Sequence, residues 1–499
     1  MSHVVGIDVS TTATKALVID VQGRVVGTGV AHYDYEMPRP MWTEQDPLVW
    51  WEATCSAVRS ALARAGVSEG DVEAVGLTGQ MHGSVLLDEA GDVVRPAILW
   101  NDQRTSLECQ EIRRRVGRER LIAVTGNDAL TGFTAPKLLW VANNEPENWE
   151  RVSTILLPKD YVRFRLTGTR AVDVAGGSGT ILFDLAGRTW SPEILDALGI
   201  RDDLCPPAFE GPEVTGRISP EGASATGLVK GTPVVAGGGD QSANAVGLGA
   251  VEPGITALSL GTSGVVFAVS EGPSIDRDAR VQAFCHAVPE RWHLMGTMLS
   301  AAGSLRWLRD ALAPGVDFDQ LLGGASEVPP GSDGLIFLPY LSGERTPHPD
   351  PMARGAFVGL TLTHDFRHMT RAVLEGVAFG LRDGLDLMVE AGVPRPQSVR
   401  VSGGGSRSQL WLQIIADVLE TRIDRVATEE GAAFGAGILA LVGVGEFSSG
   451  VDATEALVRV EPSVRPSELS GSYRDLHTSY RALYPALRST FHALSRQVS

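Results

Sequence analysis

The chain has 499 residues, and its 60 acidic side chains against 43 Lys and Arg give a formal net charge of −17. This charge speaks against general nucleic-acid binding, because that activity needs a basic surface, and we expect no nucleic-acid partner. Hydrophobic residues make up 43% and charged residues 21%. That balance is typical of a globular protein with apolar material for more than one core, and the length allows about two to four domains.

The cysteines and the first residues indicate the compartment. Cys55, Cys109, Cys205 and Cys285 form no CxxC pair and no zinc-binding spacing, so we expect four reduced thiols. The chain does not open with a basic stretch followed by an apolar one, and no apolar run reaches the roughly 18 residues of a membrane span. We therefore expect a cytoplasmic protein without a membrane contact.

The first elements along the chain are predicted to be a strand, a small polar turn at TTAT (11–14) and a second strand. A helix is predicted from Asp46, which suits the N-cap, to Gly66, which suits the C-cap. Residues 72–83 then predict a strand that runs into a loop between glycines. Residues 84–102 predict a hairpin around an Ala-Gly-Asp turn.

The same order of elements returns in the second half of the chain. Residues 232–241 predict a strand that ends in a glycine-rich turn, 255–270 a strand, a Gly/Thr/Ser turn and a strand, and 399–411 a strand, a glycine turn and the start of a helix. Two similar strand–turn–strand units about 250 residues apart predict two related α/β domains that face each other. From about residue 470, helical spacing of Tyr and Leu predicts a terminal helix.

Two polar hairpin turns are candidate phosphate sites. In DVSTTATK (8–15) the backbone amides and hydroxyls can cradle phosphate oxygens, and Asp8 at the strand end can hold Mg²⁺ directly or through water. An ordinary hairpin with a capping Asp is the alternative for this segment alone. LSLGTSG (258–264) is a second turn in the same relative place, and two such turns can grip phosphates from both sides.

GGGDQ (237–241) delivers a carboxylate from a tight turn at the end of a predicted buried strand. The glycines allow the turn and a close approach of substrate. Asp240 can then accept the proton of an attacking hydroxyl during phosphoryl transfer. A helix N-cap explains Asp240 equally well, because a helix can follow at SANAVG.

A third glycine turn, SGGGSRSQLW (402–411), can lie against a flat adenine. Other nucleotide motifs are absent, since the sequence has no GxxxxGK[ST] and no HRD and DFG pair of a protein kinase. GAGILA (435–440) fits GxGxxA, but no strand leads into it, and residues 429–443 predict one helix of small residues. His82, taken alone, is more typical of a hydrogen-bonded loop residue than of a catalyst.

Taken together, these segments resemble the FGGY family of carbohydrate kinases, which has the actin/Hsp70/sugar-kinase fold. The resemblance covers about residues 3–440 in matching order, which is far more specific than any one motif. Its segments are MWTEQDP (41–47), TGQMHG (78–83), RPAILWND (95–102), GFTAPKLLW (132–140), LLPKDY (156–161), GGGD (237–240), LSLGTSG, RWHLM (291–295), FLPYLSGERTPH (337–348), RAVLEGVAF (371–379) and SGGGSRSQLW.

The resemblance implies an architecture. It is an α/β fold of two actin/Hsp70/sugar-kinase (ribonuclease H-like) domains, each with a mixed sheet flanked by helices, that face each other across a catalytic cleft. We expect an N-terminal sugar-binding domain over residues 1–247, a C-terminal nucleotide-binding domain over 248–445 and a helical extension over 446–499. Whether the protein forms a homodimer is left open.

The resemblance also implies a reaction, the transfer of the γ-phosphoryl group of ATP to the C5 hydroxyl of D-xylulose with Mg²⁺ as cofactor. Asp240 matches the catalytic base, and Asp8 and Asp240 are the expected metal residues. The sugar is expected to contact Gln80, Met81, His82, Asp240 and Gln241. The expected ATP-binding residues are Thr11, Thr12, Lys15, Gly261, Thr262, Ser263, Gly403, Gly404, Gly405 and Ser408.

Three residues depart from the family pattern. Ser10 stands where the first phosphate loop commonly has Gly, and Ala13 where Gly or Ser is frequent, which puts the loop geometry in question. Gln241 stands where Asn is frequent. The alternatives to D-xylulose are another sugar or polyol, such as D-ribulose, a pentitol or a deoxy-ketose. A non-catalytic nucleotide switch of the same fold is a further alternative, although the QMHG, GGGDQ and LSGERTPH segments speak against it, since a switch needs no sugar pocket.

Overall fold

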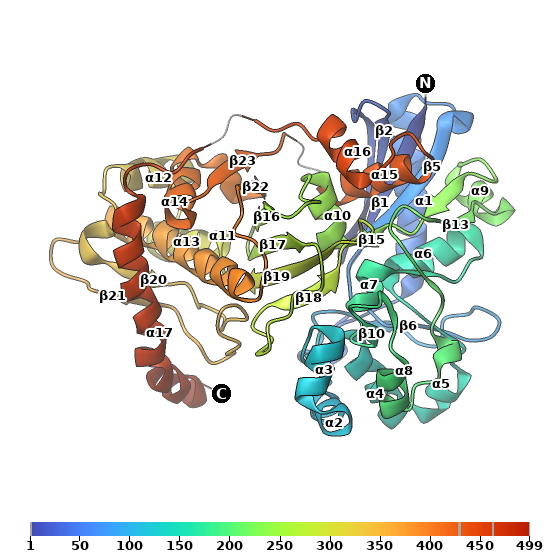
Figure 1. The fold of residues 1–499 in the computed structure, drawn as a ribbon, viewed down its shortest axis with the longest axis horizontal. Coiled ribbons are helices and arrows are strands. Elements are labelled where there is room, and N and C mark those ends of the chain that lie inside the picture. The colour runs from blue at the N-terminus through green and yellow to red at the C-terminus, as the bar shows by residue number, and fades with distance from the viewer. Residues whose placement is uncertain (1, 428–430, 462–463, 499) are drawn as a thin grey trace.

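The computed structural model describes residues 2–427, 431–461 and 464–498 and consists of two α/β domains, each built on one large sheet (Figure 1). The N-terminal sheet has the order β13-β14-β5-β1-β2-β3, with β15 also paired to β5, and the C-terminal sheet has the order β18-β19-β17-β16-β22-β23. The strands are β1 (His3–Val9), β2 (Ala13–Asp20), β3 (Val25–His32), β5 (Val72–Gly79), β13 (Val214–Arg217), β14 (Pro233–Val235), β15 (Gly238–Gly239), β16 (Ile255–Leu260), β17 (Gly264–Ser270), β18 (Gln282–Cys285), β19 (Trp292–Met298), β22 (Ser398–Ser402) and β23 (Arg422–Arg425).

The two sheets repeat one another. Each has a central antiparallel hairpin, β1–β2 and β16–β17, with a third antiparallel strand beside it, β3 and β19. Two further strands run parallel to the first strand of the hairpin, β5 and β14 in one sheet and β22 and β23 in the other. The predicted pair of related strand–turn–strand units is therefore confirmed.

Helices flank both sheets, and further helices lie in the segments that connect the strands (Figure 1). The helices are α1 (Pro47–Ala65), α2 (Ser106–Val116), α3 (Arg118–Thr125), α4 (Thr134–Asn144), α5 (Pro146–Arg151), α6 (Pro158–Thr167), α7 (Val174–Ser178), α8 (Pro192–Leu198), α9 (Pro220–Thr226), α10 (Asp240–Gly247), α11 (Ala302–Leu312), α12 (Phe318–Ser326), α13 (Phe366–Glu390), α14 (Gln409–Leu419), α15 (Gly431–Gly443), α16 (Gly450–Leu457) and α17 (Ser470–Val498), with short 3₁₀ turns η1 (Glu69–Asp71), η2 (Asp202–Leu204), η3 (Ser332–Gly334) and η4 (Gly404–Arg407). The remaining short strands are β4 (Glu44–Gln45), β6 (Val85–Leu87), β7 (Ala97–Ile98), β8 (Thr154–Leu156), β9 (Val172–Asp173), β10 (Phe183–Asp184), β11 (Thr189–Trp190), β12 (Ala208–Phe209), β20 (Ile336–Leu338) and β21 (Ala356–Val358).

Helix α1 has the predicted limits and packs against β2 and β3. Its N-cap Asp46 accepts a hydrogen bond from the Leu48 amide at 2.9 Å, and Gly66 ends it in the left-handed conformation. A Cβ on Gly29 of β3 would lie 1.9 Å from the carbonyl oxygen of Ala57. A glycine at that strand position therefore lets the helix approach the sheet.

The hairpin predicted over residues 84–102 is only partly formed. The turn is present, with the Gly91 amide donating to the Asp88 carbonyl at 3.0 Å, and isolated bridges join Leu87 to Val93 and Ser84 to Ile98. The continuous pairing of strand β6 is with β8, and that of β7 is with β4. Pro96 lies between these two bridges and has no amide hydrogen to donate, which interrupts the hairpin ladder.

Helices α10 and α15 are exchanged between the domains. In the chain α10 follows the N-terminal sheet, yet its Ala245 packs with Ala257 and Phe267 of the C-terminal sheet. Conversely, Phe434 and Ile438 of α15 belong to one core with residues of β1, β2 and β5. The predicted small-residue helix is confirmed over 431–443, whereas residues 429 and 430 lie outside the described part of the chain.

Bare glycine backbone lets α15 lie directly on the N-terminal sheet. A Cβ on Gly6 of β1 would lie 2.0 Å from the Ala433 carbonyl oxygen, and one on Gly76 of β5 would lie 1.9 Å from that of Ala436. Such distances are far below any van der Waals contact, so no other residue fits these strand positions without moving the helix. The contact joins the two halves of the chain, with α15 beside β1 and β5 at the upper right of Figure 1.

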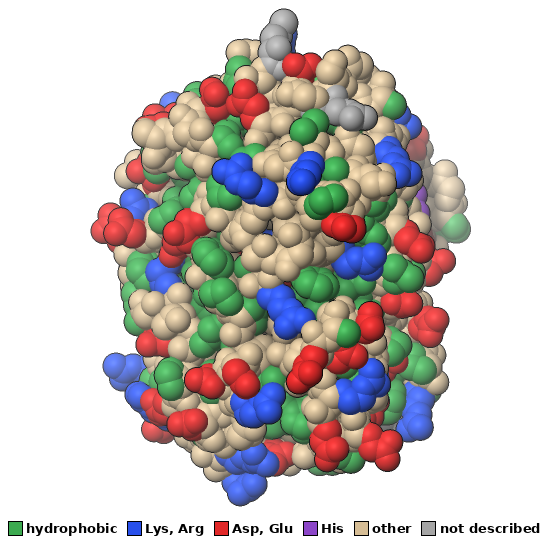
Figure 2. Space-filling model, turned by 90° about the vertical axis from the view of Figure 1, so that its right-hand side faces the viewer, with side chains coloured by type: hydrophobic (Ala, Val, Ile, Leu, Met, Phe, Trp, Pro, Cys, Tyr) green, Lys and Arg blue, Asp and Glu red, His purple; other side chains and the backbone are tan. Residues whose placement is uncertain are grey.

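The surface and the C-terminus complete the fold. The predicted terminal helix is confirmed as α17, which is joined to the C-terminal domain by a hydrogen bond between Tyr480 and Tyr340 at 3.0 Å. Figure 2 shows the face at the right of Figure 1, where acidic and basic side chains are interspersed. Within the described residues, no helix combines the length and the apolar character needed to cross a bilayer. All four cysteines are free thiols.

Candidate active site

The ends of three parallel strands bring the N-terminal candidate residues together. In the register of β1, β5 and β15, Asp8 and Gly238 both lie opposite Thr78. Because parallel strands end at the same edge of a sheet, Asp8, the residues that follow β5 and the residues that follow β15 meet there. Gln80 comes directly after β5 and Asp240 directly after β15.

Asp240 is not a helix cap. It is the first residue of α10, whose N-cap is Gly239, and its carboxylate accepts a hydrogen bond from the next amide, that of Gln241, at 2.7 Å. The N-cap alternative for Asp240 is therefore wrong. The side chain is half-buried, so it is within reach of a ligand.

The electrostatic surroundings of Asp240 favour a proton acceptor that works near neutral pH. Burial raises the pKa of the Asp240 carboxyl, and the negative charge of Asp8 raises it further, to about 7, while hydrogen bonds from Gln241 act in the opposite direction. Asp8 itself accepts a hydrogen bond from the Ser10 hydroxyl at 2.8 Å. A carboxylate whose pKa lies near the working pH is well suited to general base catalysis.

Met81 and His82 are packed next to the turn that carries Asp240. A Cβ on Gly239 would lie 2.7 Å from the Met81 sulfur, so Met81 rests on the glycine turn before Asp240. His82 has a left-handed backbone, with φ of 68°, which is strained for a residue with a side chain. Its Nδ1 donates to the Gly179 carbonyl at 2.7 Å, and its ring meets the edge of Phe133 with 4.8 Å between centroids.

These contacts fix the protonation of His82. Burial lowers the pKa of the His82 imidazole to about 3, so the ring is neutral at working pH. A carbonyl only accepts hydrogen bonds, so the proton of the neutral ring lies on Nδ1. Nε2 then carries a lone pair and can accept a hydrogen bond from a sugar hydroxyl.

Three residues near His82 and the first hairpin turn were not expected from the sequence. Lys137 is buried and donates to the His82 carbonyl at 2.9 Å, which holds the strained backbone in place. The positive charge of Arg345, from the C-terminal domain, adds to the lowering of the His82 pKa. Trp100 donates from Nε1 to the Thr11 hydroxyl at 3.0 Å. All three lie in segments that resemble the family, GFTAPKLLW, GERTP and ILWND, and the charge of Lys137 inside an apolar run was the signal for that residue.

The first candidate phosphate loop has its carbonyl groups turned away from its amides. The carbonyls of Ser10 and Thr12 accept from the Tyr33 hydroxyl at 2.7 Å and the Tyr33 amide at 3.0 Å, and the Thr11 carbonyl accepts from the buried Gln45 at 3.1 Å. Within the described chain, the Thr11 and Thr12 amides donate to no protein group. Amides held in this way can bind an anion.

The family departures in this loop do not strain it. Neither Ser10 nor Ala13 has a positive φ, so the loop does not use a conformation that only glycine tolerates. Lys15, on β2, lies opposite Asp8 in the hairpin register. The first loop is therefore formed with Ser and Ala in place of glycine.

The second candidate loop, Gly261–Ser263, is built on the same plan. The Ala302 amide donates to the Gly261 carbonyl at 2.9 Å, and the Ala301 amide donates to the Thr262 carbonyl at 2.8 Å. In the part of the chain that the structure describes, the Thr262 and Ser263 amides have no protein acceptor. Both loops thus present amides rather than carbonyls.

The glycine turn after β22 lies against the second loop. Ser402 pairs with Ser259, and a Cβ on Gly403 would lie 2.8 Å from the carbonyl oxygen of Leu260. Gly403 and Gly404 are exposed, and a Cβ on Gly404 would meet no other atom within 4 Å. The expected adenosine residues Gly403, Gly404 and Gly405 are therefore next to the second loop, while Ser408 caps α14 by accepting from the Trp411 amide at 3.2 Å.

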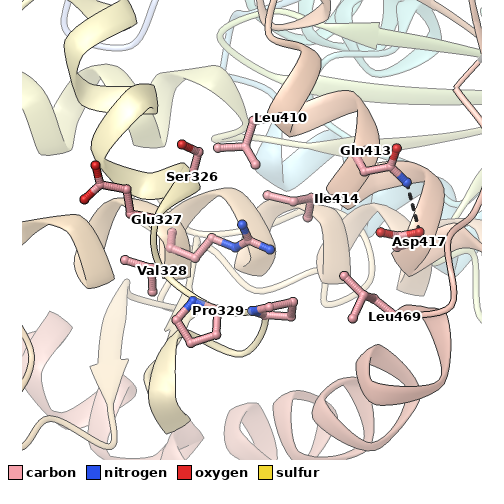
Figure 3. Close-up of a pocket in the computed structure, with 11 residues that line it drawn as sticks. Ser326, Glu327, Val328, Pro329, Leu410, Gln413, Ile414, Asp417 and Leu469 are labelled. Atoms are coloured by element: carbon pink, nitrogen blue, oxygen red, sulfur yellow. Dashed lines mark hydrogen bonds between the residues drawn. The ribbon is translucent and has the colours of Figure 1, made fainter.

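A separate cavity of about 340 Å³ lies between α12, α13 and α14. Figure 3 shows its lining, in which Gln413 donates to Asp417 at 3.1 Å. Arg371, which also lines the cavity, is bound to Glu375 at 2.7 Å. None of the residues expected to bind sugar, ATP or metal lines this cavity, so it is distinct from the candidate active site.

Two sheets of one topology, each ending in a loop of outward amides, with a half-buried carboxylate beside them, define a two-domain phosphotransferase of the sugar-kinase fold. Known proteins agree with this class. The N-terminal domain of the FGGY family of carbohydrate kinases matches residues 3–247, and the C-terminal domain of that family matches residues 256–444. The chain belongs to the FGGY family of carbohydrate kinases, which confirms the resemblance and the predicted fold.

Among the relatives, a xylulose kinase of Escherichia coli K12 is 46% identical over 440 residues, 88% of this chain and 89% of that protein. A xylulose kinase of Bacillus subtilis 168 is 38% identical over 466 residues, 93% of each. The crystal structure of a xyloylose kinase from Brucella ovis superposes with a TM-score of 0.91 at 39% identity and covers 98% of this chain and 100% of that one. Carbohydrate kinases of this kind use ATP and a sugar as substrates, and this membership does not favour a non-catalytic switch.

Proposed function

We propose that the protein transfers the γ-phosphoryl group of ATP to the C5 hydroxyl of D-xylulose, giving D-xylulose 5-phosphate and ADP. The observation that carries the proposal is the position of Asp240 beside Met81 and His82, at the end of the strands that also hold Asp8. The names of the relatives, several of them xylulose kinases, supply the sugar.

In this mechanism Asp240 is the general base. One of its carboxylate oxygens accepts the proton of the attacking hydroxyl as the new bond from that oxygen to the γ-phosphorus forms and the bond from the γ-phosphorus to ADP breaks. His82 orients the sugar, since its Nε2 accepts from another hydroxyl, and Gln80, Met81 and Gln241 complete the sugar contacts. The Gln80 side chain is buried, with no described acceptor for its Nε2, so it can donate to a hydroxyl.

The amides of the two hairpin loops are proposed to bind the phosphates of ATP. Thr11, Thr12 and Lys15 act from the N-terminal domain, and the second group acts from the C-terminal domain. That second group consists of the loop Gly261, Thr262 and Ser263 and the adenosine residues Gly403, Gly404, Gly405 and Ser408.

Asp8 and Asp240 fit a divalent cation. The charge of Asp8 raises the pKa of Asp240, and a cation held by these two residues would relieve this repulsion. Carboxylates with room for water are what Mg²⁺ prefers. When bound, Mg²⁺ neutralises charge on the transferring phosphoryl group.

The proposal assigns residues 1–247 to sugar binding, 248–445 to nucleotide binding and 446–499 to a helical extension. Closure of the two domains would align the hydroxyl with the γ-phosphorus and exclude water. A homodimer and a cytoplasmic location remain predictions.

A coupled assay of ADP release tests the substrate. Rates are compared as kcat/KM over D-xylulose, D-ribulose, pentitols, glycerol and gluconate, the last because a gluconate kinase from Lactobacillus acidophilus has a TM-score of 0.93 at 26% identity. We expect the highest kcat/KM with D-xylulose. A tenfold preference for any other compound would contradict the proposed substrate.

Replacement of the base tests the mechanism. Asp240→Asn should lower kcat by about two orders of magnitude or more, because the amide accepts no proton, while the affinity for ATP stays within about twofold. Near-normal turnover in this variant would remove Asp240 from the role of base.

A further inference from the structure

Four fully buried charges lie behind the candidate active site. Lys159, Asp160 and Arg163 come from α6 and Asp173 from the start of α7, and each side chain is at most 1% exposed. Lys159 contacts Asp160 at 2.6 Å and Asp173 at 2.5 Å, and Arg163 contacts Asp160 at 2.8 Å. We call these four residues the buried quartet. Its two positive and two negative charges balance.

Burying an ion pair is rarely the most stable solution for a core. Well-packed apolar residues of similar size are often as stable or more stable, because desolvation offsets the attraction between the charges. Attraction among its own charges therefore does not by itself explain the buried quartet. Its members also bind a backbone carbonyl on one side of the quartet and a backbone amide on the other.

On one side the quartet holds the turn that carries Asp240. Arg163 donates to the carbonyl of Ala236 at 2.5 Å and to that of Ala171 at 2.7 Å, and Lys159 reaches the same Ala236 carbonyl at 3.5 Å. Ala236 immediately precedes the three glycines that lead to Asp240. Glycines have no side chains to pack, so the path of this turn depends on backbone contacts such as these.

On the other side the quartet holds the partner of His82. The Asp173 carboxylate accepts from the Gly176 amide at 2.7 Å and so caps α7. At the far end of α7 the Gly179 amide donates to the Gly176 carbonyl at 3.0 Å, and the Gly179 carbonyl accepts from His82 Nδ1 at 2.7 Å. Helices α6 and α7 lie together near strand β15 of the N-terminal sheet (Figure 1).

We propose that the buried quartet is a positioning device that holds Asp240 and His82 in one frame, so that the base and the sugar contact keep a fixed separation. The proposal rests on the proposed function, since it needs both residues to act on the sugar. The quartet residues are positioning residues and touch no reacting atom. Their replacement should therefore affect the sugar side of the reaction and spare the ATP side.

Arg163→Lys is the sharpest test. Lysine keeps the charge and the pairing to Asp160 but has no planar fork for two carbonyls. We expect kcat to fall about 10- to 100-fold, as a displacement of about 1 Å can do, and the KM for D-xylulose to rise, with the KM for ATP within about twofold. Arg165→Lys is the matched control on the same helix, because Arg165 donates to the Tyr161 hydroxyl, outside the quartet. It should stay within about twofold in every constant.

Asp173→Asn tests the other end of the quartet. It removes the charge that pairs with Lys159 while keeping the size of the side chain, and it should raise the KM for D-xylulose in the same direction. Circular dichroism and thermal unfolding show whether each variant is folded. A purely structural role would lower the melting temperature and the active fraction, which reduces kcat and leaves both KM values unchanged.

Each outcome decides the proposal. It is overturned if folded Arg163→Lys and Asp173→Asn keep kcat and the sugar KM within about twofold of the unmodified protein. It is equally overturned if neither variant folds, since the quartet would then be a stability element, or if activity falls only in step with stability. Failure of the proposed function is distinguishable, because the unmodified protein would then release no ADP with D-xylulose.

Discussion

The titration of Asp240 gives a prediction that depends on two identified causes. Burial and the charge of Asp8 raise the pKa of the Asp240 carboxyl from 3.8 to about 7. A general base acts only when ionised, so kcat/KM for the sugar should fall as the pH drops through this value. The perturbation is Asp8→Asn, which removes the neighbouring charge and keeps the shape of the side chain.

The size of the effect follows from the order of the causes. With a pKa near 7, about one-tenth of Asp240 is ionised at pH 6, so kcat/KM should fall about tenfold for each further pH unit of acidification. Burial is the larger cause and the Asp8 charge the second. Asp8→Asn should therefore move the acid midpoint to lower pH but leave it above 3.8, the ordinary value for an aspartate.

The assay is kcat/KM for D-xylulose from pH 5 to 9 at limiting ATP and Mg²⁺, so that the profile reports the enzyme without a bound cation, in the unmodified protein and in Asp8→Asn. The variant is expected to be slower at every pH, because Asp8 is itself proposed to hold the metal, so only the midpoint is compared. Lys137 needs a control, since burial lowers the pKa of its ammonium to about 7 as well. Lys137→Met should leave the acid midpoint in place.

Two results would refute this reasoning. An acid midpoint that stays the same in Asp8→Asn would mean that Asp8 does not act on the base. A midpoint that moves in Lys137→Met and not in Asp8→Asn would assign the titration to the lysine. The raised pKa would then no longer support Asp240 as the general base.

Two stability predictions use the same structure. Gly76→Ala should lower the melting temperature by several °C, because its Cβ would lie 1.9 Å from the Ala436 carbonyl oxygen. The control Gly70→Ala should change the melting temperature little, because its Cβ would meet no atom within 4 Å. Equal melting temperatures of the two variants in differential scanning calorimetry would contradict this close packing. Asp240→Asn should raise the melting temperature, more at pH 8 than at pH 5. Between its ordinary pKa and its pKa of about 7 in the folded protein, the aspartate is ionised more in the unfolded chain than in the folded one, so the stability of the folded protein falls as the pH rises. Asparagine does not ionise and avoids this loss. An unchanged melting temperature at pH 8 would contradict the raised pKa.

Local sequence patterns were enough for the parts of the fold that are local. The two hairpins, the limits of α1 and the terminal helix follow from alternation, caps and helical spacing, and the structure confirms them. The hairpin at residues 84–102 was right in its turn and in two bridges, but its strands pair mainly with β4 and β8, because strands of two or three residues pair with whichever edge the fold brings near them.

The role of Asp240 could not be decided from its segment. An aspartate between a strand and a helix suits both a cap and a base, and only the hydrogen-bond geometry, with Gly239 as the N-cap, separates them. Lys137 and Arg345 were missed for a related reason. Both act on His82, which lies more than 50 residues before Lys137 in the sequence and in the other domain from Arg345. No local sequence pattern encodes such an interaction.

The exchange of α10 and α15 makes the two halves of this chain mutually dependent. A fragment that ended at residue 247 would leave bare the face of its sheet that α15 covers, and the remaining fragment would lack Ala245 of α10, which packs with Ala257 and Phe267. Each piece alone would present an apolar surface to water. When both fragments are present, each carries a helix that packs on the other. The molecule is therefore well suited to reassembly from two separately produced fragments.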